Sequence, residues 1–117
     1  MTSGISLIVY PVSDLSASRT LFTAFLGTEP YADAPYYVGY RPGTGPEIGL
    51  DPNARPGQGP ICYSDVADIE AALEKLIAAG ATAERPVSDV GGGLLVATVR
   101  DPDGNILGLR QPPPEAA

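Results

Sequence analysis

The segment RDPDGNILGLRQ, residues 100–111, decides the fold of this chain. It follows the run Leu94–Val99 and contains a second strand-like run, Ile106–Arg110. Between the runs, a proline stands at the second position of a four-residue turn and a glycine at the fourth, as type I turns prefer. Asp101 can accept hydrogen bonds from the backbone of that turn. The segment therefore predicts a β-hairpin, and turn chemistry rather than catalysis explains its aspartates.

Upstream of the hairpin, the second half of the chain begins with a strand and a helix. Ile61–Tyr63 is a short apolar run typical of a strand. A helix is expected after it, capped by Asp65 or Asp68 and ended by Gly80. Its apolar stripe at helical spacing consists of Ile69, Ala72, Leu73, Leu76 and Ile77. A further short strand is expected near residues 82–87, before the flexible triple-glycine turn 91–93.

The first half of the chain repeats this order of elements. Ile5–Tyr10 predicts a strand, and Ser13 or Asp14 can cap the helix after it. The apolar positions of that helix are Leu15, Phe22, Phe25 and Leu26, and Gly27 ends it. Short strands are expected within 31–51, the best of them at Tyr36–Tyr40 and Glu47–Leu50.

Neither half could bury a sheet alone, so an internal duplication of a βαβββ unit is the economical interpretation. We predict one domain over residues 1–117, with module one at about 1–52 and module two at about 59–117. Asp51–Gly59 holds prolines and glycines without apolar periodicity, which is typical of a linker between the modules.

Composition excludes several classes of partner. The chain has 7 basic and 14 acidic residues, a net charge of −7, no histidine and one cysteine. Nucleic acid is excluded as a partner because phosphate contacts need clustered lysine and arginine. A cationic small molecule would be attracted, although solubility is the commoner reason for an acidic surface. With no signal-peptide pattern and no membrane-spanning run, we expect a cytoplasmic protein with no membrane partner, and Cys62 as an inert buried thiol.

The closing hairpin, together with the duplicated plan, resembles the vicinal oxygen chelate superfamily (glyoxalases, ring-cleaving dioxygenases, bleomycin- and fosfomycin-resistance proteins). The resemblance covers essentially the whole chain. It implies an α+β fold in which two tandem βαβββ modules form an open, curved barrel-like sheet with the helices outside. It also implies a homodimer with pockets at module or subunit junctions, which would cover exposed sheet edges.

The same resemblance places the metal ligands of the superfamily on residues of this chain. They fall on Leu7, Gly49, Ile61 and Gly108, although the second placement can shift to Glu47 or Asp51. Leucine, glycine and isoleucine side chains carry no donor atoms, whereas divalent ions need imidazole or carboxylate ligands. We therefore expect no metal and no other cofactor.

Strand alternation divides the side chains between two faces. One face is apolar and is expected to pack beneath the helices; it carries Ile8, Tyr10, Ile48, Leu50, Cys62, Leu107 and Leu109. The other face corresponds to the ligand-binding surface of the superfamily, and its predicted ligand-binding residues are Leu7, Val9, Glu47, Gly49, Ile61, Tyr63, Gly108 and Arg110. Tyr31, Tyr36, Tyr37 and Tyr40 are expected in the core or an interface first, and as a stacking platform for a ligand second.

Two functions compete at this point. The first is a metal-independent small-molecule binding protein that resembles the bleomycin-resistance branch and sequesters a drug without transforming it. The alternative is a metal-free lyase or isomerase on the same scaffold, with acid–base chemistry assigned to Glu47, Tyr63 or Asp65 because histidine is absent. Two further possibilities are a metal enzyme whose ligands are carboxylates at other positions, and a domain that serves only to dimerise. The sequence identifies neither the ligand nor a catalytic residue.

Overall fold

The computed structural model describes residues 4–54 and 59–114, which form two compact units. Residues 6–61 form one unit, which we call module one, and residues 62–114 together with Gly4 and Ile5 form the other, module two. The boundary residues Ile5 and Ile61 are described with the strands that they begin, in modules one and two respectively. The predicted linker Asp51–Gly59 lies partly outside the described residues. No helix in the described part of the chain is long and apolar enough to cross a membrane.

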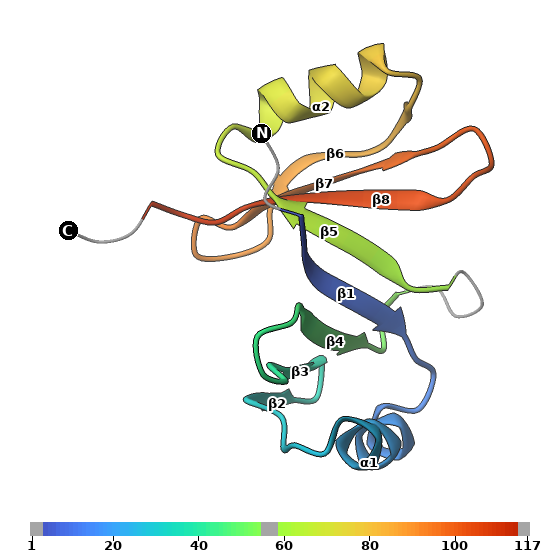
Figure 1. The fold of residues 1–117 in the computed structure, drawn as a ribbon, viewed down its shortest axis with the longest axis vertical. Coiled ribbons are helices and arrows are strands. Elements are labelled where there is room, and N and C mark those ends of the chain that lie inside the picture. Colours follow the sequence, from blue (N-terminus) through green and yellow to red (C-terminus); the bar gives the residue numbers. More distant parts are fainter. Residues whose placement is uncertain (1–3, 55–58, 115–117) are drawn as a thin grey trace. The chain divides into compact units, whose positions relative to one another are not determined.

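Module one contains one helix and a four-stranded sheet (Figure 1). Its elements are β1 (Ile5–Pro11), α1 (Leu15–Leu26), β2 (Ala32–Ala34), β3 (Tyr37–Tyr40) and β4 (Glu47–Asp51). The strand order is β2-β3-β4-β1, where β1 runs parallel to β4 and the other neighbours are antiparallel. The predicted strand Tyr36–Tyr40 begins one residue later, because residues 35 and 36 form the turn from β2.

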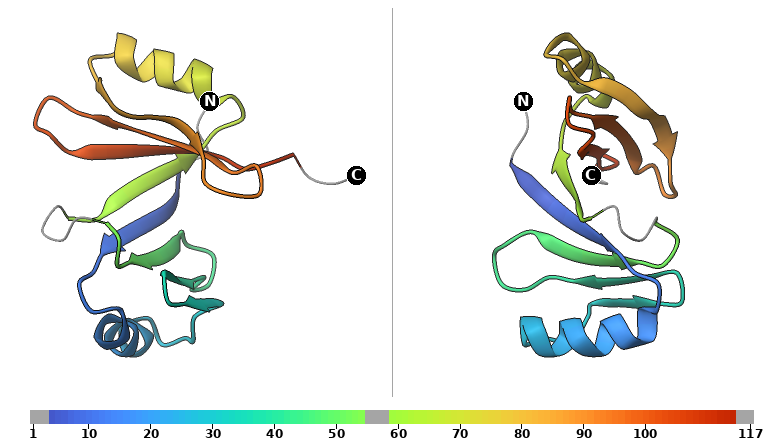
Figure 2. Two further views of the ribbon diagram at one scale, coloured as in Figure 1. Left: turned by 180° about the vertical axis from the view of Figure 1, so that it is seen from behind. Right: turned by 90° about the vertical axis from the view of Figure 1, so that its right-hand side faces the viewer.

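Module two repeats this topology. Its elements are β5 (Ile61–Asp65), α2 (Ile69–Ala78), β6 (Thr82–Asp89), β7 (Leu95–Arg100) and β8 (Ile106–Gln111). The order is β6-β7-β8-β5, with β5 parallel to β8 and the rest antiparallel. In each module the helix lies against one face of its own strands (Figure 2). The predicted α+β class with tandem βαβββ modules is confirmed.

Local side-chain hydrogen bonds explain where the elements start and stop. Asp14 and Asp68 are the N-caps, and their carboxylates accept hydrogen bonds from backbone N–H groups three residues later. Gly27 caps α1 with a left-handed φ of 70°, as predicted. In the closing hairpin, Asp101 accepts bonds from the N–H groups of Asp103 at 2.9 Å and Asn105 at 2.8 Å. The Asn105 side-chain amide also donates a hydrogen bond to Asp101. This bond is the largest cause of the lowered pKa of Asp101, and the backbone bonds add to it.

Each module has its own hydrophobic core between the helix and the sheet. Module one buries Val12, Val38, Tyr40 and Leu50, against which Tyr10, Leu15, Phe22, Leu26 and Ile48 pack. Module two buries Val66, Ile69, Ala97 and Leu109, against which Ala72, Leu73, Leu76, Val87 and Leu95 pack. The predicted placement of Tyr10, Ile48, Leu50 and Leu109 beneath the helices is therefore confirmed.

Several predicted core positions are wrong. Phe25 is 75% exposed and Ile77 is 41% exposed, because at 100° per residue each lies well to one side of its helix's buried stripe. Leu107 is 40% exposed, and Cys62 is only half-buried. The alternation of the strands was predicted correctly, but the helices do not cover every residue of the apolar face.

Tyr40 joins helix and sheet in module one through its buried hydroxyl group. That hydroxyl donates to the backbone carbonyl of Arg19 at 3.0 Å and shares a 2.9 Å hydrogen bond with the Thr23 hydroxyl. The residue is fully buried, so neither bond competes with water.

Replacing Tyr40 with phenylalanine should lower the free energy of unfolding by about 1–3 kcal/mol, because it leaves buried polar partners unsatisfied. Urea denaturation followed by circular dichroism measures this change. Tyr36→Phe is the matched control, since Tyr36 is 68% exposed, and it should stay within about 0.5 kcal/mol of the parent. Equal stabilities of the two variants would contradict the role assigned to the Tyr40 hydroxyl.

Candidate functional site

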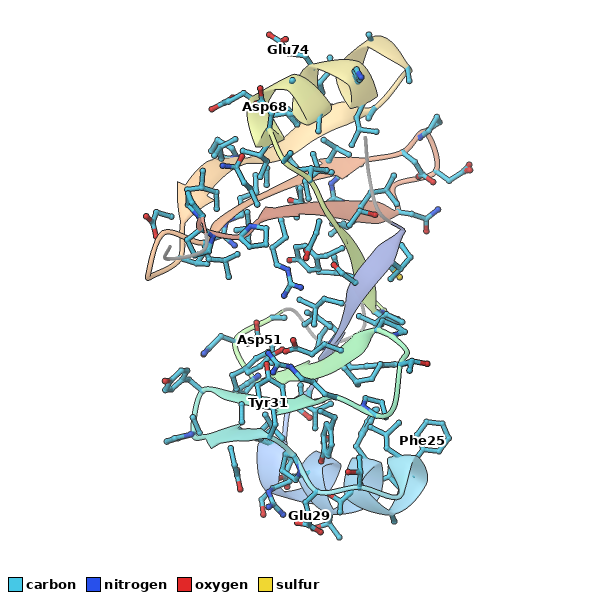
Figure 3. The ribbon with its side chains drawn as sticks, turned by 60° about the vertical axis from the view of Figure 1, so that its left-hand side comes forward. Phe25, Glu29, Tyr31, Asp51, Asp68 and Glu74 are labelled. Carbon is cyan, nitrogen blue, oxygen red and sulfur yellow. The ribbon has the colours of Figure 1, made fainter. Side chains whose placement is uncertain are left out.

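The helix-free face of module one carries the most distinctive polar chemistry of the chain. Strand pairing places Leu7 beside Glu47, and Val9 beside Gly49, which is also the partner of Gly39. Leu7 and Val9 are buried apolar side chains on this face. Tyr31 lies over Gly39 on this face. Phe25, by contrast, projects from α1 (Figure 3).

Glu47 is held by two tyrosines. Its Oε2 atom accepts hydrogen bonds from the hydroxyl groups of Tyr31 at 2.6 Å and Tyr37 at 2.9 Å. Only 11% of the Glu47 side chain is exposed, although it belongs to an acidic residue at the start of a strand. Two phenol donors on one carboxylate oxygen make this an ordered polar group rather than a solvated surface charge.

Two glycines make room for the tyrosine rings. A Cβ atom on Gly49 would collide with the Tyr37 hydroxyl and would lie 2.7 Å from its Cε1 atom. A Cβ atom on Gly39 would lie 2.9 Å from Tyr37 Cε2 and 3.0 Å from Tyr31 Cε1. The tyrosines therefore reach Glu47 by lying flat on a strip of backbone that has no side chains.

Arg41 completes the cluster from the end of β3. Its guanidinium carbon lies 3.9 Å from the centroid of the Tyr31 ring, in the geometry of a cation–π contact. Its Nε atom lies 3.9 Å from Glu47 Oε1, which is an ion pair but not a hydrogen bond. The Arg41 side chain is 67% exposed. We call Tyr31, Tyr37, Arg41 and Glu47 the tyrosine–glutamate cluster.

The cluster raises the pKa of Tyr31. Burial of the phenol is the largest cause, followed by its hydrogen bond to Glu47 and the charge of that carboxylate. The nearby Arg41 acts in the opposite direction. Tyr31 therefore keeps its proton, and the hydrogen bond to Glu47, to a higher pH than an ordinary tyrosine.

The helix-free face of module two is built on the same plan around Tyr63 and Gly108. The two residues are paired across β5 and β8. A Cβ atom on Gly108 would collide with Tyr63 Cδ2 and would lie 2.7 Å from its Cγ atom. A tyrosine ring thus covers a glycine in the last strand of each module.

Two sets of charged side chains on this second face form contacts within module two. Arg110 Nε donates to Asp65 Oδ1 at 2.7 Å, and the two residues are neighbours in register. Glu84 accepts from the buried Thr98 hydroxyl at 2.5 Å and from Arg100 at 2.7 Å. The strand β6 is irregular near Glu84, with a register shift between Ala83 and Arg85.

Two hollows in the described residues lie on the helix side of the modules, away from these faces. One of about 490 Å³ lies between α1 and β2, where Arg19 is already paired with Asp33 at 2.9 Å. The other, of about 230 Å³, lies between α2 and β8 and is mostly apolar. Neither hollow contains a residue that the superfamily resemblance assigns to ligand binding.

The family model of the Glyoxalase/Bleomycin resistance protein/Dioxygenase superfamily matches residues 4–109. The chain belongs to this superfamily. No curated protein matches it.

Solved structures with the same fold come from several bacteria. A superfamily member from Vibrio splendidus 12B01 has a TM-score of 0.68 at 19% identity, covering 96% of this chain and 100% of its own. Methylmalonyl-CoA epimerase from Streptomyces coelicolor, with 2-nitronate-propionyl-CoA, has a TM-score of 0.74 at 14% identity, covering 100% and 99%. That from Mycobacterium tuberculosis has a TM-score of 0.68 at 15% identity, covering 97% and 90%. At these identities the likeness shows the fold alone.

The residues present do not fit the divalent metal of the superfamily. Of the four positions that resemblance assigns to ligands, Gly49 and Gly108 lie beneath tyrosine rings, and Leu7 and Ile61 carry no donor atoms. Of the two alternative ligands, Glu47 accepts hydrogen bonds from two phenols and Asp51 accepts one from the Asn53 N–H at 2.8 Å. The carboxylate of Asp65 is paired with Arg110. Within residues 4–54 and 59–114, no three His, Cys, Asp or Glu side chains form a group that could hold a metal ion.

The structure places the predicted ligand-binding residues on the helix-free faces, but their contact with a ligand stays a prediction. Tyr40 is in the core as expected, whereas Tyr36 and Tyr31 are 68% and 49% exposed. Arg41 was not among the predicted residues, although it continues the alternation of Tyr37 and Gly39. Nor were Glu84, Thr98 and Arg100, whose contacts depend on the irregular register of β6.

Replacing Gly49 with alanine should lower the free energy of unfolding by about 1–3 kcal/mol, because the new methyl group must displace the Tyr37 ring. Urea denaturation measures the change. In a Tyr37→Ala background the same substitution should cost less, because the ring is gone. Equal costs in both backgrounds would show that the ring does not limit the space above Gly49.

Replacing Glu47 with glutamine should lower the pKa of Tyr31 toward the usual tyrosine value of about 10, although burial keeps part of the elevation. In the parent, the raised pKa of Tyr31 means that the protonated phenol stabilises the folded state. This stabilisation is fully present below pH about 10 and is lost as the pH rises through the raised pKa. NMR titration of the labelled tyrosine ring carbons measures the shift. Glu29→Gln, an exposed carboxylate change outside the cluster, should leave it unaltered.

Proposed function

We propose that the chain is a metal-independent small-molecule binding protein of the glyoxalase/bleomycin-resistance type, which sequesters a drug-like ligand without transforming it. The observation that carries the proposal is the tyrosine ring lying over a glycine in the last strand of each module, at positions assigned to metal ligands. A site filled by an aromatic ring offers a stacking surface in place of coordinating atoms.

The chemistry of the helix-free faces supports this class of ligand. They combine apolar side chains, tyrosine rings and a few ordered charged groups, as small-molecule sites generally do. In module one the ligand-contacting residues are Leu7, Val9, Glu47 and Gly49, and in module two they are Ile61, Tyr63, Gly108 and Arg110. The net charge of −7 favours a cationic ligand over an anionic one.

A metal-free lyase or isomerase is the second candidate, and Glu47 is the observation that favours it. This carboxylate is 11% exposed and has two phenols on one oxygen, so a base and proton donors are already adjacent. The other two residues considered for acid–base chemistry have structural contacts: Asp65 pairs with Arg110, and the Tyr63 ring covers Gly108. We also propose that the protein is cytoplasmic and that it is a homodimer, the latter as the superfamily resemblance implies. Size-exclusion chromatography with light scattering tests the dimer.

Isothermal titration calorimetry against cationic glycopeptides and heteroaromatic drugs should detect a ligand, with the same affinity before and after EDTA treatment. Mass spectrometry of the recovered ligand should find it unchanged. Binding that EDTA abolishes and a divalent ion restores would overturn metal independence. Conversion of the ligand by the parent but not by Glu47→Gln would favour the second candidate, and absence of heat across the panel would remove the main support for sequestration.

A further inference from the structure

The tyrosine–glutamate cluster holds a carboxylate oxygen whose bonding is incomplete. Glu47 Oε2 has both phenols, at 2.6 and 2.9 Å. Oε1 has the Arg41 Nε atom at 3.9 Å, well beyond the roughly 2.7–2.9 Å of a charge-assisted hydrogen bond. No polar side-chain atom of the described residues is both fully buried and without a hydrogen-bond partner, so Oε1 remains accessible to a donor from outside the protein.

Arg41 occupies the cluster loosely. Its guanidinium group stacks on Tyr31, with the carbon 3.9 Å from the ring centroid, but it does not reach hydrogen-bonding distance of the carboxylate. It stays 67% exposed, and exposed ion pairs and cation–π contacts contribute little free energy. The Arg41 guanidinium group therefore occupies the position of a cation beside Glu47 but makes no hydrogen bond to the carboxylate.

We infer that Tyr31 and Glu47 form a subsite for a ligand's guanidinium or ammonium group, and that Arg41 is its built-in occupant, displaced when the ligand binds. An untethered cation can stack on the Tyr31 ring and also donate to Oε1 at normal distance, which Arg41 does not. Displacement moves Arg41 outward, where it is already mostly exposed. This inference rests on the proposed binding function and adds to it the charged group of the ligand and the residue that competes with it.

The test uses methylguanidinium chloride as the probe and its neutral analogue N-methylurea as the matched control ligand. Titrations of the full chain are followed by NMR at the Tyr31 ring and the backbone amides of Gly39 and Gly49. Methylguanidinium should shift these signals saturably, and N-methylurea should not. Arg41→Ala should tighten probe binding about three- to thirty-fold, because the competing occupant is gone.

Other variants separate the parts of the subsite. Glu47→Gln should abolish saturable binding, while Tyr31→Phe, which keeps the ring, should bind the probe better than Tyr31→Leu, which does not. Arg85→Ala removes an exposed arginine of β6 outside the cluster and should bind like the parent. Circular dichroism establishes whether each variant is folded. If Glu47→Gln does not fold, the probe affinities of the Arg41 and Tyr31 variants test the subsite.

Unchanged or weaker binding in Arg41→Ala would overturn the inference, as would equal binding of methylguanidinium and N-methylurea. Its failure is distinct from failure of the proposed function. If a drug binds with the same affinity to Arg41→Ala and to the parent, the sequestration proposal is supported and the subsite is contradicted. If the probe binds as stated but no drug gives heat, the subsite is supported and sequestration is contradicted.

Discussion

The parallel pairing of the first and last strands is the constraint on which each module depends. β1 lies beside β4, and β5 beside β8, although a helix and two strands separate the partners in the chain. A parallel pair needs a crossover connection, and here the crossover includes the helix. The helix must then lie on one face of the strands, which leaves the opposite face of every module without a covering element of its own.

That opposite face explains why glycines and tyrosines occur together in this chain. A bare sheet face of a small module exposes backbone and apolar side chains unless something lies over it. In module one, Tyr31 and Tyr37 lie over Gly39 and Gly49, and in module two Tyr63 lies over Gly108. Two of these glycines, Gly49 and Gly108, stand at positions to which the superfamily resemblance assigns metal ligands, and glycine has no side-chain donor atom.

The carboxylates on these faces accept hydrogen bonds from neighbouring side chains of their own module. Glu47 takes two phenol donors, Asp65 takes a guanidinium group, and Glu84 takes a hydroxyl and a guanidinium group. Each arrangement offsets the cost of taking a charge out of water. They differ in completeness, because the arginines of module two reach hydrogen-bonding distance and Arg41 of module one does not.

The sequence by itself determined the duplicated βαβββ plan and the hairpin at Asp101, because these depend on periodicity and on hydrogen bonds spanning a few residues. For each helix the sequence left two candidate caps, Ser13 or Asp14 and Asp65 or Asp68, of which Asp14 and Asp68 are the caps in the structure. It also determined that positions 7, 49, 61 and 108 carry no donor atoms, since that is a matter of residue identity alone. The exposure of Phe25 and Ile77 escaped it because positions at the edge of a helical stripe are ambiguous without the packed sheet. Only the tertiary structure decided that Tyr31 and Tyr37 bind Glu47, and that Arg41 stacks on Tyr31. Those residues are up to 16 positions apart, and the register of three strands, which no local pattern encodes, sets the distances between them.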